Sequence, residues 1–292
     1  MISAANRKIK YERIYQKMID SVDSRLAVAA SPSSSASLFS NTTANWTSTV
    51  FVPNSQCWLQ DLRPQLTGVH MYAGGYLQSY AAAPISPRHG LSVSHGGPDI
   101  GTTIRFVSPT GTVFTTTILK WINDNPNVGQ GSVSDAKQPY VTDLSVYLFE
   151  HELPDWVFKA AILPIANSDR NISYPMDPPT VVISQGNWTI GPAESNTPKN
   201  RQVYVKSLNL ITPRPLLRNP FHHEVVVGDS GSPEFALIDN KLYLVRIVTS
   251  YGGSGVFLGD YLNYINSLIK RADASASIST GYKAIVARLP RI

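Results

Sequence analysis

The chain is poor in cysteine. Cys57 is its single cysteine among 292 residues, so no disulfide can form within the chain. Stability must then come from core packing, and a chain of this length is long enough to bury a substantial core. Cys57 has no CxxC partner, and we expect it to be a small buried hydrophobe. The absence of disulfides is typical of a reducing compartment.

Charged residues and long apolar runs are also scarce. Charged residues make up 15% of the chain and apolar residues 42%, which argues against extensive disorder. No stretch approaches the ~18 consecutive apolar residues of a membrane-spanning helix. The first residues, MISAANRKIK, lack the apolar run of a secretory signal peptide. We therefore expect no membrane span, and an intracellular or virion-associated protein in preference to an ordinary secreted one.

The net charge of +5 is placed at the two ends of the chain. Residues 1–38 carry six basic and three acidic side chains, and residues 270–292 carry five and one. The central part, 39–269, is slightly acidic, with 14 basic and 16 acidic side chains. Basic ends can contact nucleic acid or another anionic surface, or can be solvated tails, and both interpretations stay open.

Residues 1–44 are expected to form a short helix followed by a linker. Apolar side chains recur at helical spacing from Tyr11 through Ile14 and Met18 to Val22, which predicts an amphipathic helix. Its apolar face packs either on the rest of the chain or on a partner. The Ser-rich stretch SPSSSASLFSNTT that follows is too small and polar to bury much.

Residues 45–271 are predicted to be a β domain that ends in a helix. Gly and Pro total 40 residues, and they punctuate short runs rich in Val, Ile, Thr and Tyr, a pattern typical of barrels or sandwiches. Near the end, DYLNYINSLIKR has helical periodicity and predicts a helix over 260–271, with Asp260 as its N-cap. Residues 272–292 are expected to be a basic C-terminal tail.

The hexapeptide GDSGSP, residues 228–233, is the sharpest chemical signal in the sequence. A nucleophilic serine needs a tight turn with little crowding and backbone N–H groups directed at the developing oxyanion. Glycines on both sides of Ser230 supply that freedom. The same letters also suit an ordinary turn, so the interpretation depends on finding partners for Ser230.

This hexapeptide resembles the nucleophile motif of the chymotrypsin-like (trypsin-like) serine peptidase family. The resemblance implies an all-β fold of two packed Greek-key antiparallel β-barrels, at about residues 45–160 and 175–260, with a C-terminal helix. It also implies a serine endopeptidase acting on protein or peptide substrates with no metal or cofactor. In this family the catalytic residues occur in the order His, Asp, Ser.

The histidine that matches the family pattern is His95. It follows Leu91-Ser92-Val93-Ser94, which resembles the strand that the family places before its catalytic histidine. His89 is the competing candidate, but it lies at the start of that strand.

The aspartate that matches is Asp143, which precedes the alternating apolar strand LSVYLF. Asp135 is the weaker alternative because polar residues follow it. The resemblance then assigns His95 as the general base, Asp143 as the residue that orients it, and Ser230 as the nucleophile. The backbone N–H groups of Gly228 and Ser230 form the implied oxyanion hole.

Downstream residues match the substrate-binding parts of the family. Ser250, Tyr251 and Gly252 resemble the edge that pairs with the substrate backbone, and Gly255 resembles a glycine of the specificity pocket. Glu224 lies six residues before Ser230, where the family places the base of that pocket. A carboxylate there favours a basic residue before the scissile bond. The alternative is that Glu224 is simply exposed.

A departure from the family limits what can be transferred. There is no IVGG-like segment before His95 whose freed amine would pair with the aspartate preceding the serine, here Asp229. Either the oxyanion hole forms without activation or another cation holds Asp229. A binding or structural protein that keeps the peptidase fold is therefore the alternative function. An α/β-hydrolase is excluded because no histidine follows Ser230.

Overall fold

The structure is a computed structural model, which describes most of the chain in separate stretches. The described residues are 4–29, 38–42, 50–69, 71–72, 81–95, 99–123, 142–165, 177–184, 202–208, 213–222, 229–249 and 255–288.

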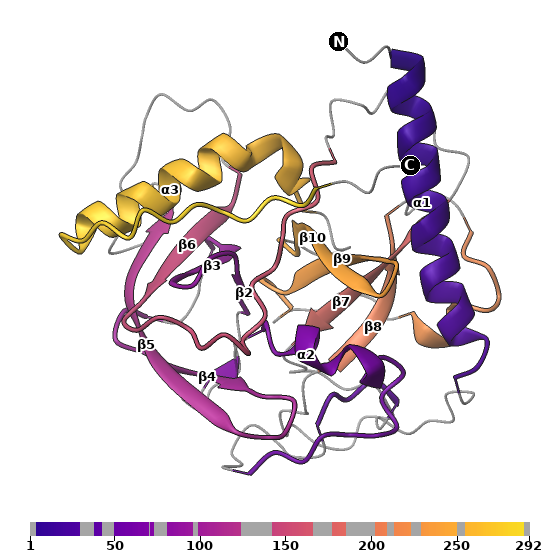
Figure 1. The fold of residues 1–292 in the computed structure, drawn as a ribbon, viewed down its shortest axis with the longest axis horizontal. Helices are drawn as coiled ribbons and strands as arrows, with labels where there is room; N and C mark the ends of the chain where they lie inside the picture. Colours follow the sequence, from indigo (N-terminus) through magenta and orange to yellow (C-terminus); the bar gives the residue numbers. More distant parts are fainter. Residues whose placement is uncertain are drawn as a thin grey trace.

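The described residues form two antiparallel sheets and three α-helices (Figure 1). The helices are α1 (Ala4–Leu26), α2 (Arg63–Leu66) and α3 (Leu262–Ser275), with short 3₁₀ helices η2 (Gln60–Leu62), η4 (Asn219–Phe221) and η6 (Leu258–Tyr261). The strands are β1 (Met71–Tyr72), β2 (Ala83–Pro84), β3 (His89–Val93), β4 (Thr103–Val107), β5 (Val113–Asn123), β6 (Leu144–Phe149), β7 (Pro179–Ser184), β8 (Gln202–Ser207), β9 (Pro233–Ile238) and β10 (Lys241–Ile247). The predictions of antiparallel β structure and of a helix near the C-terminus are confirmed.

The first sheet has six strands in the order β1-β4-β5-β6-β3-β2. Its long strand β5 pairs with β4 through its first half and with β6 through its second half. The β5–β6 register shifts between Ile118 and Lys120, and such irregularities bend a strand and increase its twist. The sheet therefore curls around a core of buried aromatic and aliphatic side chains, which includes Phe106, Tyr147 and Phe149.

The second sheet has four strands in the order β10-β9-β7-β8. Asp239 and Asn240 connect β9 to β10 and both have positive φ, the conformation that a two-residue hairpin loop requires. Side chains of β9 alternate between two cores: Phe235 and Leu237 belong to the large core shared by both sheets, whereas Ala236 and Ile238 belong to the core beneath α1. Both faces of this sheet are thus covered.

Helix α1 packs on the second sheet, which settles whether its apolar face covers a partner or the chain itself. Ile14, Met18 and Val22, spaced four residues apart, are fully buried, and the helix contacts β7 and β9. Burial of each such side chain stabilises the fold by roughly 1.5–3 kcal/mol. Arg218 adds two bonds from its guanidinium to the carboxylate of Asp23, at 2.7 and 3.0 Å.

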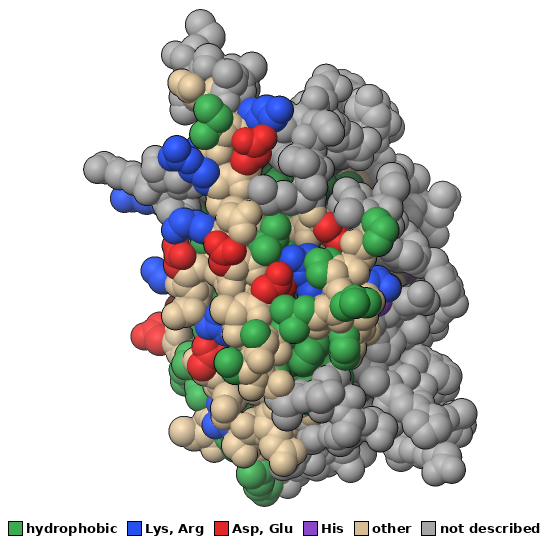
Figure 2. All heavy atoms as spheres, turned by 90° about the vertical axis from the view of Figure 1, so that its right-hand side faces the viewer, with side chains coloured by type: hydrophobic (Ala, Val, Ile, Leu, Met, Phe, Trp, Pro, Cys, Tyr) green, Lys and Arg blue, Asp and Glu red, His purple; other side chains and the backbone are tan. Residues whose placement is uncertain are grey.

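The outer face of α1 is polar. Figure 2 shows Lys and Arg side chains interspersed with Asp and Glu on this side of the molecule. Lys17, for example, pairs with Asp239 of the β9–β10 turn, and Arg25 pairs with Asp61. Contact between the basic ends and nucleic acid stays a prediction.

Helix α3 begins and ends later than the sequence pattern predicts. Residues 258–261 form the 3₁₀ turn η6, so Asp260 lies in that turn and Tyr261 is the N-cap of α3, with no side-chain cap bond. The helix continues to Ser275 and buries Ile265, Leu268 and Ile269 in the shared core. None of the helices in the described ranges is both long and apolar enough to span a membrane.

Residues 276–288, expected to belong to a tail, lie against the body of the molecule. The amides of Ile162 and Ala287 donate to the carbonyls of Ile285 and Ile162, at 2.8 and 2.9 Å, and the amide of Ile285 donates to Ile85. Ile162 also bridges to Leu244 of β10. This segment of the chain therefore links the two sheets, while Lys283 and Arg288 are exposed.

Candidate active site

Ser230 lies on a tight turn that immediately precedes β9 and is bonded to Val248 just after β10. The amide of Ser232 donates to the carbonyl of Asp229, and the amide of Gly231 donates to the carbonyl of Val248, both at 2.9 Å. Val248 in turn donates to the carbonyl of Ser232, at 2.9 Å. The turn is therefore fixed by backbone bonds on both sides of the nucleophile candidate.

Gly231 is required in this turn for two separate reasons. Its φ of +82° is one that residues with a side chain rarely adopt. A Cβ atom on it would also lie 2.3 Å from the carbonyl oxygen of Ala81 and 2.5 Å from the hydroxyl of Ser92. The second glycine of GDSGSP thus allows the Ser230 turn to approach the first sheet closely.

His95 and Asp143 are brought together by the pairing of β3 with β6. The two strands are antiparallel, with Val93 opposite Leu144, so the residues just beyond them face each other. The amide of Ser94 donates to the carbonyl of Asp143, at 2.9 Å, and extends the ladder by one bond. Asp143 itself has a φ of +56°, which turns its side chain out of the strand geometry just before β6 begins.

The Asp143 carboxylate is held by bonds to both of its oxygens. Oδ1 accepts from the hydroxyl of Ser94 at 2.7 Å, from the amide of Ser94 at 3.2 Å and from the amide of His95 at 3.0 Å. Oδ2 lies 2.5 Å from Nδ1 of His95. The three bonds at Oδ1 therefore orient the carboxylate independently of its contact with the imidazole.

His95 joins Asp143 to Ser230. Its Nε2 lies 2.9 Å from Oγ of Ser230, so the three side chains form one continuous hydrogen-bonded chain. An ionised carboxylate can only accept, so Nδ1 carries the proton and Nε2 of the neutral ring is left to accept from the serine hydroxyl. The His95 side chain is 41% exposed, which leaves the arrangement open to a ligand from solvent.

The hydrogen bond to Asp143 raises the pKa of His95 above its usual value, and the negative charge of Asp143 acts in the same direction. Partial burial of the ring acts in the opposite direction. The imidazole thus gains basicity from its partner. Below the raised pKa the ring is a cation and cannot accept the proton of Ser230.

His89, the competing histidine, is fully buried on the other end of β3. Its Nδ1 lies 2.8 Å from the hydroxyl of Ser86 and its Nε2 lies 3.1 Å from Oδ1 of Asp273 in α3. Burial lowers its pKa more than Asp273 raises it. His89 therefore connects β3 to the C-terminal helix and has no access to solvent.

Several predicted site residues lie outside the described residues: Glu224, Gly228, Ser250, Tyr251, Gly252 and the alternative aspartate Asp135. Gly255 is described, and it lies against β10. A Cβ atom on Gly255 would be 2.2 Å from the carbonyl oxygen of Ile247. This close approach explains why a glycine is present there, and its predicted role in the specificity pocket stays untested.

Sequence reasoning missed the polar groups that support the site. The sequence places Ser94 in the strand before the histidine but does not indicate that its hydroxyl makes the 2.7 Å bond to Asp143. Lys206, Glu234 and Arg246 are buried in strands that are otherwise largely apolar. A charged residue in the interior of each of the runs QVYVKS, PEFALI and KLYLVRI is the signal that would have identified this group.

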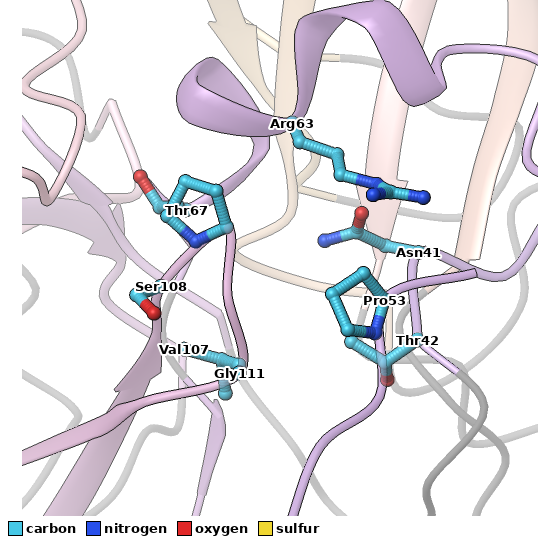
Figure 3. A pocket seen from close by; sticks show the side chains of 9 residues that line it. Asn41, Thr42, Pro53, Arg63, Thr67, Val107, Ser108 and Gly111 are labelled. Atoms are coloured by element: carbon cyan, nitrogen blue, oxygen red, sulfur yellow. The ribbon is translucent and has the colours of Figure 1, made fainter. Parts of the chain in front are cut away.

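A small hollow lies elsewhere in the molecule, between the segment around Asn41 and Pro53 and the β4–β5 turn (Figure 3). Arg63 and Thr67 also line it. It has room for about one water molecule. The residues that line this hollow do not include His95, Asp143 or Ser230.

The chain matches no protein-family model and no curated protein. Its function must therefore be argued from the arrangement of its own residues.

Proposed function

We propose that the protein is a serine endopeptidase. The observation that carries the proposal is the hydrogen-bonded chain from Asp143 through His95 to Ser230, with distances of 2.5 and 2.9 Å. A serine, a base within hydrogen-bond reach and a third group that orients the base are the arrangement that nucleophilic catalysis by a serine requires.

The proposed reaction begins when the Ser230 hydroxyl attacks the carbonyl carbon of a peptide bond. His95 accepts the hydroxyl proton at Nε2, while Asp143 holds the ring in the required tautomer and stabilises the imidazolium. The negative charge moves to the former carbonyl oxygen, for which the amides of Gly228 and Ser230 are the proposed donors. His95 then gives its proton to the leaving amine and an acyl-enzyme remains.

A water molecule then hydrolyses the acyl-enzyme and completes the cycle. His95 takes a proton from the water, and the resulting hydroxide attacks the acyl carbon. Collapse of the second tetrahedral intermediate releases the carboxylic acid, and the proton returns from His95 to Oγ of Ser230. No step needs a metal or cofactor.

The fold assignment within this proposal is the two-barrel, chymotrypsin-like arrangement. In support, the first sheet is curled, His95 and Asp143 lie at its β3 and β6 strands, and Ser230 precedes β9 of the second sheet. The order His, Asp, Ser along the chain fits the same arrangement. A basic residue before the scissile bond, selected by Glu224, is the proposed specificity.

The first test is covalent labelling of the folded protein with a fluorophosphonate, which reacts with activated serines. We expect labelling of wild type and none of Ser230→Ala or His95→Gln. His151→Gln is the matched control, because His151 is an exposed histidine at the end of β6 with 66% of its side chain accessible. A folded wild type that is not labelled would favour the alternative, a peptidase-fold binding or structural protein.

The second test concerns specificity. Cleavage of a peptide library by wild type is expected to show basic residues before the cleaved bond, and Glu224→Ala is expected to lose that preference. An unchanged preference in the variant would remove Glu224 from the pocket and leave the catalytic assignment intact.

A further inference from the structure

Four formally charged side chains are buried near the Ser230 turn. Lys206 is 2% exposed, Asp229 4%, Glu234 0% and Arg246 7%. Taking a charge out of water costs several kcal/mol unless an opposite charge and hydrogen bonds compensate it. The positions of these four groups relative to one another therefore matter for the stability of the turn.

Glu234 is the centre of the group. Its Oε1 accepts from Nη2 of Arg246 at 3.2 Å and from the hydroxyl of Thr180 at 2.6 Å, and its Oε2 lies 3.8 Å from Nζ of Lys206. Each of the strands β7, β8, β9 and β10 contributes one of these residues. The group therefore connects all four strands of the second sheet, including β9, which directly follows the Ser230 turn.

Among the charged side chains that the structure describes in this cluster, the charges do not balance without Asp229. Lys206 and Arg246 supply two positive charges and Glu234 one negative charge, so one positive charge remains. Lys206 is within electrostatic reach of all three other groups: burial lowers its pKa most, Glu234 and Asp229 raise it, and Arg246 lowers it. With Asp229 included, the buried group of four is neutral.

Asp229 is part of the turn that carries Ser230. It immediately precedes Ser230, and its carbonyl accepts the amide of Ser232 at 2.9 Å. Its side chain is buried, so the carboxylate needs a compensating cation. A cation that retains the Asp229 carboxylate inside the protein stabilises the turn in this conformation.

We propose that Lys206, held by Glu234, is the buried cation that balances Asp229 and keeps the Ser230 turn in its reactive conformation. The inference rests on the proposed peptidase function. Lys206 is a positioning residue, since it acts through Asp229 and does not contact the substrate. No freed N-terminal amine is needed to form the site.

The charge balance is tested by a double-mutant cycle on the full chain with Lys206→Met and Asp229→Asn. Each single change leaves one buried charge uncompensated, and we expect the folding equilibrium constant to fall on the order of 100-fold or more in each. The double variant removes one charge of each sign. We expect it to be as stable as either single variant or more so, where independent sites would multiply the two losses.

The reactive conformation is tested by the rate of fluorophosphonate labelling, measured well below the unfolding temperature of each variant. We expect Lys206→Met to be labelled at least tenfold more slowly than wild type. Lys159→Met is the matched control, because Lys159 is also a desolvated lysine but its amine donates to the carbonyls of Leu153 and Pro154. That variant should be labelled at the wild-type rate. A wild type with a fusion domain blocking its N-terminus should be labelled as fast as the free chain.

The outcomes separate the inference from the proposed function. Stability losses that simply multiply in the double variant, Lys206→Met labelled at the wild-type rate, or labelling only after N-terminal cleavage would each overturn the inference. Absence of labelling in wild type would overturn the peptidase proposal instead. The unfolding cycle needs no activity, so it would still decide whether Lys206 balances Asp229.

Discussion

Replacement of Asp143 by asparagine is the most informative perturbation of the site. The carboxylate accepts four hydrogen bonds, three at Oδ1 from Ser94 and His95 and one at Oδ2 from the imidazole. The carbonyl oxygen of an asparagine can take over the three bonds at Oδ1. Its amide nitrogen then occupies the place of Oδ2 and faces Nδ1 of His95, so the local fold is retained.

The change reverses the tautomer of the imidazole. An amide NH₂ group donates, so Nδ1 must accept and the proton of the neutral ring moves to Nε2. Nε2 then donates to Ser230 and cannot take the hydroxyl proton. In serine peptidases of this geometry the wrong tautomer lowers kcat by about 10⁴-fold, and we expect a loss of that order with KM little changed.

The assay is peptide hydrolysis and fluorophosphonate labelling across a range of pH. Wild-type activity should fall as the pH drops through the raised pKa of His95, because the cationic ring cannot act as a base. Asp99→Asn is the control, since Asp99 is an exposed aspartate on a neighbouring loop of the first sheet. A folded Asp143→Asn protein with activity within tenfold of wild type would refute the role of Asp143.

The sequence was sufficient to predict the strands next to His95 and Asp143, because local patterns identify both strands. The alternation of Leu144, Val146 and Leu148 predicted a strand directly after Asp143, and β6 occupies that place. The run before His95 likewise forms β3. Antiparallel pairing of these two strands, which local patterns do not predict, then brings the histidine and the aspartate together.

The parts that the sequence did not predict depend on contacts between distant segments. Periodicity identified the apolar face of α1 but not the sheet that covers it, since packing is decided by tertiary structure. Lys206, Glu234 and Arg246 come from three strands whose order in the sheet is not evident from the chain. The start of α3 was also missed, because a 3₁₀ turn takes up the residues around Asp260.

Three further predictions concern single side chains. Gly231→Ala should lower the rate of Ser230 labelling more than tenfold, because the new Cβ meets the carbonyl of Ala81. Gly101 has a similar φ of +89° but open space around it, so Gly101→Ala should not change the labelling rate. Equal effects of the two variants would show that backbone strain alone matters. Met18→Ala should destabilise the protein by about 2–5 kcal/mol in denaturant unfolding, because it leaves a cavity beneath α1. Val28 is 85% exposed, so the control Val28→Ala should change the stability by less than about 0.5 kcal/mol. The last prediction concerns acid stability. Burial holds the pKa of His89 below its unfolded value of 6.5, so the folded state resists protonation while the unfolded state takes up a proton. The stability that comes from a neutral His89 is complete above pH 6.5 and is lost as the pH falls from there toward the lowered pKa. His89→Gln loses the packing of the buried imidazole ring, so its unfolding free energy should be lower than that of wild type at neutral pH. The glutamine is neutral and does not titrate, so the unfolding free energy of the variant should fall less steeply on acidification. Parallel pH profiles for the two proteins would show that protonation of His89 is not linked to unfolding.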